Sequence, residues 1–347
     1  MFERSVLSIA TALMLVACFT FAPAAEILDG AGATFPAPLY VRWAAAYQQA
    51  QGIVVNYDPV GSGAGIEMIR KGQVDFGASD APLSPESLAS SGLLQFPVVI
   101  GGVVPVINIR GIKAGELRLS GPVLAEIYLG RIRKWNEKPI AELNPTLQLP
   151  DVYITVVHRS DASGSSMLWT TYLAHSSLAW NAHVGASLTP AWPTGVGSIG
   201  NEGVASYVQR TRFAIGYVEY AYARNHKLSD VSLRDHDGQY VRARQETFRA
   251  AVQASSWNNR PALQQLATDL PGMSSWPITG ASFILIQTAP KSGMRTLEVI
   301  RFFDWALHHG DSIARDLDYE PIPSSVLDQL PKLWRKVISE SSNATVR

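Results

Sequence analysis

Hydrophobic positions along this chain predict short strands that alternate with amphipathic helices. Apolar, β-branched runs predict strands at Ile53–Tyr57, Tyr153–Val157 and Phe213–Val218. The first two runs lead through polar turns into segments with helical periodicity, which include Ile66 and Leu168, and the third leads directly into an aromatic helix. This alternation is typical of α/β proteins with mainly parallel sheets, whose ligands bind beyond the carboxyl ends of the strands.

Two longer apolar runs depart from this alternation. They cover residues 96–108, which include the pair Gly101 and Gly102, and residues 276–286. Small residues inside a long strand permit close approach and bending, so both runs are predicted to cross between two domains. We therefore predict two lobes with a ligand cleft between them. The first lobe is discontinuous and contains residues 26–99 plus 284–347, and the second contains residues 100–283.

The first 25 residues have the pattern of a secretory signal peptide. A charged start is followed by an apolar run and then by the small residues Ala22-Pro23-Ala24-Ala25. The segment that ends at Cys18 resembles a lipobox, but residues 19–21 are still apolar, so soluble release is favoured over lipid anchoring. We therefore expect residues 1–25 to be removed on export, and no later segment is apolar for long enough to span a bilayer.

Composition limits the classes of function. Cys18 is the only cysteine, so the mature chain depends on a hydrophobic core rather than on disulfides, and 47% apolar residues can supply that core. The 29 basic and 29 acidic residues balance, so no net field attracts nucleic acid or an acidic membrane surface. The basic run at residues 131–134 is interpreted as a solvated helix end. Any recognition of an anion must therefore be local.

Chemistry suited to an anion is concentrated in four polar turns. They are Ala33–Phe35, Gly61–Gly63, Ser79–Ala81 and Arg159–Ser165. Each precedes a predicted helix, whose first amides have no intrahelical partner and favour negative charge. Each turn also has a simpler explanation, because serines cap helices and an aspartate before Ala-Pro stabilises its own turn.

Other glycine and aromatic patterns are predicted to be structural. Residues 190–200 hold three glycines with the spacing of a dinucleotide fingerprint, but two prolines stand where a buried strand would be needed. This stretch is predicted to be a loop before a helix at Val204–Val208. Tyr220 and Tyr222 are interpreted as core packing, and residues 225–245 receive no assignment.

No pattern indicates catalysis or a resident metal. The histidines form no HExxH or HxH group, and His158 is expected on the strand face opposite Arg159. Neither Ser62 nor Ser165 stands in a complete nucleophile elbow. We therefore predict no enzymatic activity, no metal and no cofactor. An exported phosphoester hydrolase that uses the same turns is the alternative.

The polar turns stand in longer motifs that resemble a known family. Gly30–Pro38, Val74–Leu83 and Ala214–Ala223, together with the turns at Ser62 and Arg159, closely resemble the periplasmic phosphate-binding protein of the phosphate-specific ABC transporter. The resemblance covers essentially the whole mature chain. It implies a type II periplasmic binding protein fold, with two doubly wound α/β lobes joined by two crossing strands. It also implies a periplasmic monomer that binds inorganic phosphate and delivers it to the membrane permease subunits of an ABC importer.

The phosphate contacts of that family carry over residue by residue. The resemblance implies a set of hydroxyl and amide donors: Thr34, Phe35, Ser62, Ser163, Gly164 and Ser165. It further implies that Arg159 donates through its guanidinium, that Asp161 pairs with Arg159, and that Asp80 accepts. Two departures are a serine at 165, where threonine is frequent, and Gly63, where a relative has serine. The first keeps its hydroxyl, whereas Gly63 offers no side chain.

Asp80 is expected to select between anions. Hydrogen phosphate carries a proton that an ionised Asp80 can accept, whereas sulfate would bring a second negative group against the carboxylate. Arg159 adds a charge-assisted bond that can be bidentate. We therefore expect phosphate to be the ligand. A receptor for another oxyanion, such as sulfate or molybdate, is a further alternative, against which Asp80 argues.

Overall fold

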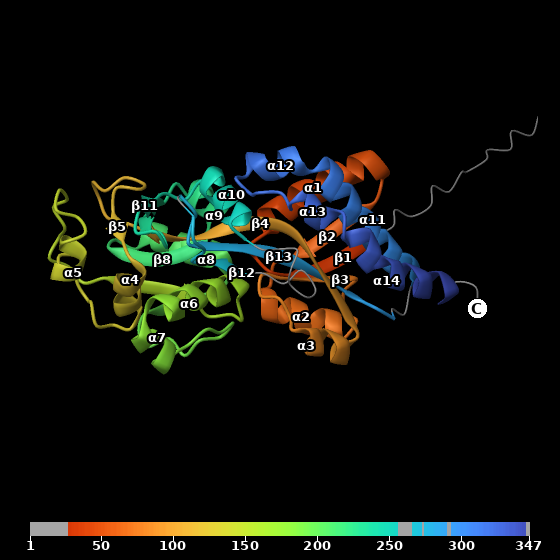
Figure 1. Ribbon diagram of the computed structural model, residues 1–347, viewed down its shortest axis with the longest axis horizontal. Helices are drawn as coiled ribbons and strands as arrows, with labels where there is room; N and C mark the ends of the chain where they lie inside the picture. The colour runs from red at the N-terminus through yellow and green to blue at the C-terminus, as the bar shows by residue number, and fades with distance from the viewer. Residues whose placement is uncertain (1–26, 256–265, 273, 290–292, 345–347) are drawn as a thin grey trace, which may run out of the picture.

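The computed structural model describes residues 27–255, 266–272, 274–289 and 293–344. The predicted signal peptide at residues 1–25, which includes Cys18, lies outside these ranges. The described chain is mixed α/β and forms an elongated molecule, in which long central strands connect two halves (Figure 1). Within the described ranges, no helix combines the length and the hydropathy needed to cross a membrane.

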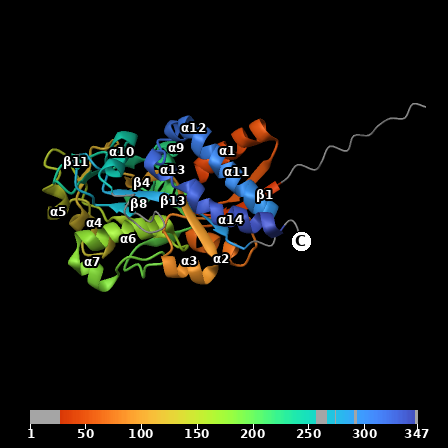
Figure 2. The ribbon, with the colours of Figure 1, turned by 45° about the vertical axis from the view of Figure 1, so that its right-hand side comes forward.

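The first half contains a parallel sheet covered on both faces. Its strands, in spatial order, are β2 (Val54–Asp58), β1 (Ile27–Gly32) and β3 (Phe76–Ser79). Two helices lie on each face (Figures 1 and 2): α1 (Ala37–Gln51) and α11 (Gly293–His309) on one, α2 (Ser62–Arg70) and α3 (Pro85–Ser91) on the other. Three helices near the C-terminus complete this half: α12 (Asp311–Asp316), α13 (Ser324–Leu327) and α14 (Leu330–Ala344).

The second half repeats this arrangement. Its parallel strands are β8 (Ala214–Glu219), β6 (Thr155–Arg159) and β7 (Val196–Ser198). Its helices are α4 (Gly121–Tyr128), α5 (Lys138–Ala141), α6 (Gly164–Ser176), α7 (Leu178–His183), α8 (Gly200–Arg210), α9 (Tyr220–Asn225) and α10 (Gln245–Gln253). The remaining strands are short: β5 (Arg118–Leu119), β9 (Ser229–Asp230), β10 (Ser232–Arg234), β11 (Tyr240–Val241) and β12 (Leu266–Thr268).

Two long antiparallel strands connect the halves, in agreement with the two predicted crossings. They are β4 (Leu93–Ile107) and β13 (Ile278–Gln287). Strand β13 pairs with β3, while β4 continues past Gly102 and pairs with β8. The sheet order β2-β1-β3-β13-β4-β8-β6-β7 therefore runs through both halves. A Cβ atom at Gly102 would lie 2.1 Å from the ring of Phe248, so a glycine here permits the close packing that the sequence predicts.

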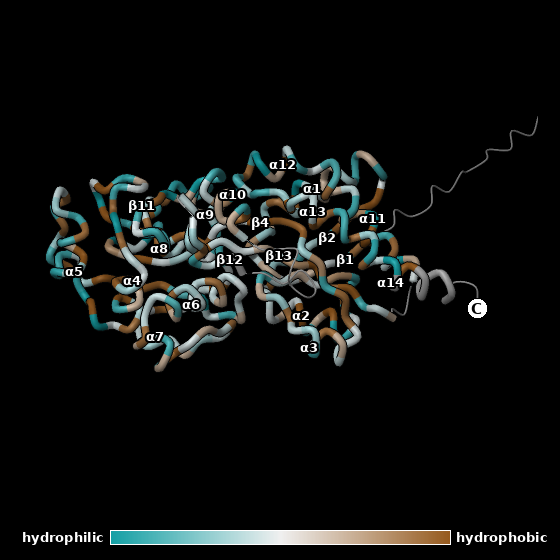
Figure 3. The backbone as a smooth tube through the Cα atoms, viewed as in Figure 1, coloured by the Kyte–Doolittle hydropathy of each residue, from teal (hydrophilic) through white to brown (hydrophobic). Residues whose placement is uncertain are grey.

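The hydrophobic core follows these central strands (Figure 3). Residues 278–286 of β13 are all buried, and β4 has one residue, Leu94, that is partly exposed. Strands with both faces covered show continuous apolar runs rather than alternation, which accounts for the pattern of the two crossings.

Two local predictions are wrong. Residues 196–198, predicted as a loop, form β7 and pair with β6. Both prolines precede Val196, so its amide is free to pair. Helix α8 begins at Gly200 rather than at Val204. Near the C-terminus, Pro331 stands in the first turn of α14, where its missing amide costs no hydrogen bond.

Candidate anion-binding site

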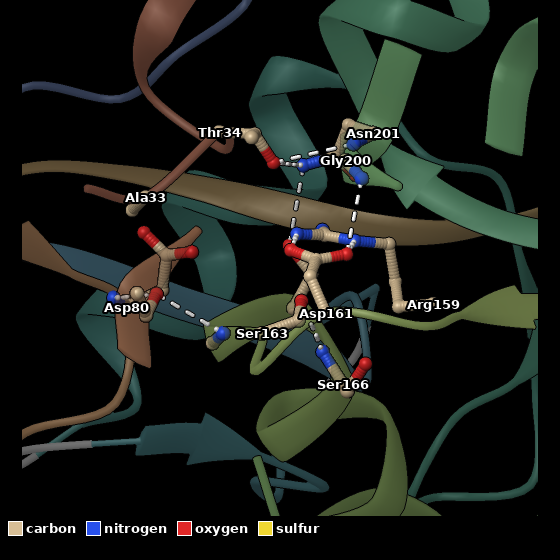
Figure 4. Close-up of polar contacts among 12 residues, drawn as sticks. Ala33, Thr34, Asp80, Arg159, Asp161, Ser163, Ser166, Gly200 and Asn201 are labelled. Carbon is tan, nitrogen blue, oxygen red and sulfur yellow. Dashed lines mark hydrogen bonds and ion pairs between the residues drawn. The ribbon is translucent and has the colours of Figure 1, made fainter. Parts of the chain in front are cut away.

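Four helices begin where the two halves meet. Figure 4 shows the residues there, with Thr34 and Asp80 from the first half and Arg159 and Asp161 from the second. In the first half, α1 follows the turn at Thr34 and α2 begins at Ser62; in the second half, α6 begins at Gly164 and α8 at Gly200. All four N-termini follow the carboxyl ends of strands, which is where α/β sheets place their ligands. Because the first amides of a helix lack intrahelical partners, this junction favours an anion.

Direct hydrogen bonds hold the two halves together at these turns. The Gly164 amide donates to Ser62 Oγ at 3.0 Å, and Asn201 Nδ2 donates to Thr34 Oγ1 at 2.8 Å. The turns that the sequence identified separately therefore form one continuous site in a closed arrangement of the halves.

The glycine at position 63 belongs to this close contact. Its amide donates to the carbonyl oxygen of Ala162 at 3.0 Å, and a Cβ atom at Gly63 would lie 2.4 Å from that of Ala162. A serine side chain would not fit here without moving the opposite turn. This departure from the resembled family thus reflects contact between the halves.

Arg159 and Asp161 form an ion pair at the end of β6. The guanidinium donates twice, from Nε to Asp161 Oδ1 at 2.7 Å and from Nη2 to Oδ2. The Gly200 amide, at the start of α8, donates to the same carboxylate at 3.0 Å. Burial raises the pKa of Asp161, but the hydrogen bond and the charge of Arg159 outweigh burial and leave that pKa below its usual value. The predicted pairing is confirmed, and it leaves Arg159 Nη1 buried without a hydrogen-bond partner among the described residues.

Four buried hydroxyl groups at the site all act as hydrogen-bond acceptors within the protein. Each oxygen accepts hydrogen bonds from donors of the protein: Thr34 from Asn201, Ser62 from Asp80 N and Gly164 N, Ser163 from Ser166 N, and Ser165 from Asn201. A hydroxyl has one hydrogen of its own, and accepting leaves that hydrogen free to donate. Ser163 is therefore a helix N-cap and still has a donor to offer, so the two interpretations of this serine are compatible.

Asp80 supplies an acceptor in this ring of donors. Its side chain is 1% exposed, and its Oδ1 atom has no hydrogen-bond partner among the described residues. Burial raises the pKa of the Asp80 carboxyl to about 7, although Ser282 and the charge of Arg159 lower it in part. The Ser282 hydroxyl, on β13, lies near the carboxyl but does not reach ordinary hydrogen-bond geometry with it.

Phe35 lies in the first turn, with its side chain fully buried. Its carbonyl oxygen accepts a hydrogen bond from the Tyr319 hydroxyl at 2.7 Å, and the two rings pack at a tilt, 6.1 Å between centroids. These contacts fix the backbone of the turn. The turns at Thr34, Ser62 and Asp80 and the start of α6 therefore meet at the junction of the halves, and Phe35 lies beside Thr34.

Two further residues, Asn201 and Tyr222, make contacts at the site that the sequence does not predict. Asn201 is fully buried and contacts both Thr34 and Ser165, yet it stood in a stretch predicted to be a loop. Its position directly after Gly200, at a helix start, was the available signal. Tyr222 packs in the core, as predicted, and its hydroxyl also donates to the Thr34 carbonyl at 2.7 Å. A tyrosine on α9 thereby reaches the first turn of the opposite half.

His158 lies outside this chemistry, as strand alternation predicts. Its ring is half-buried and stacks on Trp192 at 4.8 Å between centroids. Burial lowers the pKa of His158. Its Nδ1 atom contacts only a backbone carbonyl, that of Arg159.

Other parts of the described chain offer weaker alternatives. A cavity of about 690 Å³ lies between α10 and α13, but its charged groups are already paired, Arg249 with Glu320 and Arg315 with Asp311. Across the described ranges, His, Cys, Asp and Glu side chains form no group of three that could hold a metal ion. The junction with unpaired Arg159 and Asp80 atoms remains the candidate with distinctive chemistry.

Comparison with known proteins shows the superfamily and the family of this chain. Residues 20–305 match the model of the PBP superfamily domain, which agrees with two α/β halves joined by crossing strands. A phosphate-binding protein PstS of Pasteurella multocida is 44% identical over 333 residues, covering 96% of this chain and 97% of the relative. Its counterpart in Haemophilus influenzae is 46% identical and covers 91% of this chain and 95% of the relative. The chain belongs to the PstS family of phosphate-binding proteins.

Solved structures agree on the fold. A periplasmic phosphate-binding protein, PfluDING, bound with phosphate, superposes with a TM-score of 0.71 at 20% identity, covering 88% of this chain and 93% of the other. A phosphate-binding protein from Stenotrophomonas maltophilia gives 0.67 at 19% identity, again covering 88% and 93%. The predicted two-lobed periplasmic binding protein fold is thus confirmed.

Proposed function

We propose that this protein is a periplasmic receptor for inorganic phosphate, and that it delivers the anion to the permease of an ABC importer. One observation carries the proposal: several buried donors and one unpaired acceptor face a single site between two halves. The names of the relatives support phosphate as the ligand. The proposal includes export by the signal peptide at residues 1–25, a monomeric free state and no step of bond cleavage.

The donors and the acceptor match hydrogen phosphate. Each phosphate oxygen needs a donor once water is removed, because an unpaired buried polar group costs free energy. The proposed donors are the hydroxyls of Thr34, Ser62, Ser163 and Ser165, the amides of Phe35 and Gly164, and Arg159 Nη1. The proposed acceptor of the phosphate proton is Asp80.

Asp161 has a supporting role in this proposal. Its charge offsets that of Arg159, so the pair adds little net charge to the site. The anion is then held mainly by oriented donors and by helix N-termini. Such a site does not retain anions by charge alone, so the placement of donors and of one acceptor decides which anion binds.

We further propose that the halves open and close about the two crossing strands. The lobes in this proposal are residues 26–99 with 284–347, and residues 100–283. Strand β4 changes its partner from β13 to β8 between Gly102 and Val103, close to the proposed boundary. A register shift at Ser282 and Phe283 gives β13 an irregularity near its own boundary. Closure would bring the donors of both halves around the anion.

Isothermal titration calorimetry on the chain from residue 26 onward tests this function. We expect phosphate to bind and sulfate to compete weakly, because an ionised Asp80 repels an anion without a proton. Equal affinity for the two anions, or no binding of phosphate, would overturn the proposal. A chromogenic phosphate ester provides a second check, because turnover by the purified protein would favour a hydrolase instead.

A further inference from the structure

Asn201 bridges the two halves at the site. In each of its described side-chain hydrogen bonds, the chemistry determines which atom donates and which accepts. Its Oδ1 atom accepts from the Glu219 amide at 2.9 Å. Because a backbone amide can only donate, this bond assigns the oxygen of the Asn201 side chain and turns the NH₂ group to the other side. Nδ2 then donates to Thr34 Oγ1 at 2.8 Å and to Ser165 Oγ at 3.3 Å.

These donated bonds determine where two hydroxyl hydrogens point. The backbone amide of Asn201 donates a further bond to Thr34 Oγ1, at 3.2 Å. With their oxygens accepting from Asn201, Thr34 and Ser165 have to direct their own hydrogens elsewhere. Both residues are at least 95% buried, and no described residue accepts a hydrogen bond from either hydroxyl, so an anion in the site can take this place.

The same contacts span the halves. Thr34 lies in the turn before α1, whereas Asn201 lies in the first turn of α8, 167 residues away. Opening of the halves would separate Asn201 from Thr34 but leave its contact with Ser165, which lies in the same half. The orientation of the Thr34 hydroxyl is therefore tied to closure.

We propose that Asn201 is a positioning residue for phosphate binding: its amide orients the hydroxyls of Thr34 and Ser165 as donors and does so fully only when the halves are closed. This inference rests on the proposed function. It differs from a packing role because the chemistry of the amide, rather than its volume, carries the effect.

The substitutions Asn201→Ala and Asn201→Asp separate these roles. The alanine removes the oriented donor but lets both hydroxyls rotate and still donate, so phosphate affinity should fall about tenfold, the size of one lost hydrogen bond. The aspartate keeps the volume and the bond from the Glu219 amide. Its second oxygen would accept from both hydroxyls, turning their hydrogens away from the anion, and would add negative charge. We expect a loss of at least about a hundredfold.

Calorimetry at about pH 8.5 measures both affinities. This pH is several units above the ordinary pKa of aspartate, so the introduced carboxyl is expected to be ionised. Asn144→Asp is the matched control. Asn144 is also buried, accepts a backbone amide through Oδ1 and donates to two oxygens through Nδ2, but it lies beside Arg118 and Ile140, outside the site. Its substitution should lower the unfolding temperature without changing phosphate affinity by more than about threefold.

A double-mutant cycle gives the second readout. In a Thr34→Val background one target hydroxyl is gone, so Asn201→Ala should weaken binding by less than it does in the wild-type protein. Additive losses would contradict the inference. An aspartate variant that binds phosphate as tightly as the alanine variant would also overturn it, while the proposed function would stand. Failure of the wild-type protein to bind phosphate would overturn both.

Discussion

Asp80 and Asp161 belong to the same site, yet their carboxyl groups have opposite surroundings. Asp161 accepts from Arg159 and from the first amide of α8, and its pKa lies below the usual value. Asp80 is more deeply buried, has an oxygen to which no group of the described chain donates, and has a pKa raised to about 7. Two identical side chains thus serve different purposes: one neutralises an arginine, and the other is left able to take a bond from a ligand proton.

An unpaired buried polar atom is a stronger sign of a ligand than a buried ion pair is. A paired carboxylate is satisfied by the protein itself and needs no ligand. A buried acceptor without a partner costs free energy until something donates to it. In this site the donor Arg159 Nη1 and the acceptor Asp80 Oδ1 have no partner among the described residues, which supports the proposal of an anion that still carries a proton.

The largest expected effect comes from removing the guanidinium. Arg159→Met would eliminate the charge-assisted donor and leave Asp161 without its cation. We expect phosphate affinity to fall by about 4 kcal/mol, roughly a thousandfold, as measured by calorimetry. Arg131→Met is the control, because its ion pair with Glu126 is partly exposed and belongs to another part of the second half, and it should have no measurable effect. A loss below about tenfold for Arg159→Met would show that Arg159 does not contact the anion.

The second effect concerns stability against pH in the absence of phosphate. The folded-state pKa of Asp80 lies above its unfolded value of about 4, so its contribution is fully present below that pH and is lost as the pH rises through about 7. Asp161 has the opposite sign: its contribution is present above about pH 4 and is lost as the pH falls through its lowered folded-state pKa.

Urea unfolding of the wild-type protein and of Asp80→Asn isolates the contribution of Asp80 to the free energy of unfolding. Between about pH 5 and 8 the stability of the wild type should fall by about 3 kcal/mol relative to the variant. Glu219, another buried carboxyl whose pKa burial raises, is present in both proteins. A difference that does not change with pH would show that Asp80 ionises as easily in the folded protein as in the unfolded chain.

A third effect separates the two aspartates by selectivity. Asp80→Asn should weaken phosphate by about 2 kcal/mol and weaken sulfate less or not at all, because the repulsion of an unprotonated anion disappears. Asp161→Asn should weaken both anions in similar proportion, since it disturbs Arg159 rather than the proton acceptor. Competition calorimetry gives the ratio of affinities. An unchanged ratio in Asp80→Asn would refute the assigned role of this residue.

The smallest effect tests the environment of Asp80. Ser282→Ala removes a hydroxyl that lowers the pKa of Asp80, so that pKa should rise further. Phosphate affinity should change by about 0.5 kcal/mol or less. A carbon-13 NMR titration of the aspartate carboxyls follows this directly. A lower pKa in the variant would contradict the account.

Much of the site could be predicted from the sequence because strand-to-helix turns have local signals. Glycines, hydroxyls and charged residues at the ends of apolar runs located Ser62, Asp80 and Arg159 without any knowledge of contacts. The two crossing strands were similarly visible as long apolar runs, because burial on both faces removes polar positions.

The rest depends on contacts between residues far apart in the chain. Asn201 has an unremarkable local pattern, and its role arises from Thr34, which the fold brings to it across 167 residues. The hydroxyl of Tyr222 likewise acquires its partner only through the meeting of the halves. Local periodicity also missed β7, because this short strand forms by pairing with β6. The start of α8, directly after β7, was missed with it.

A crystal structure of the phosphate complex would show directly which atoms hold the anion. We expect phosphate oxygens within hydrogen-bond distance of Arg159 Nη1 and of the four hydroxyls, and one oxygen within that distance of Asp80 Oδ1. Phosphate bound away from these atoms, or bound here with Asp80 Oδ1 still without a contact, would contradict it.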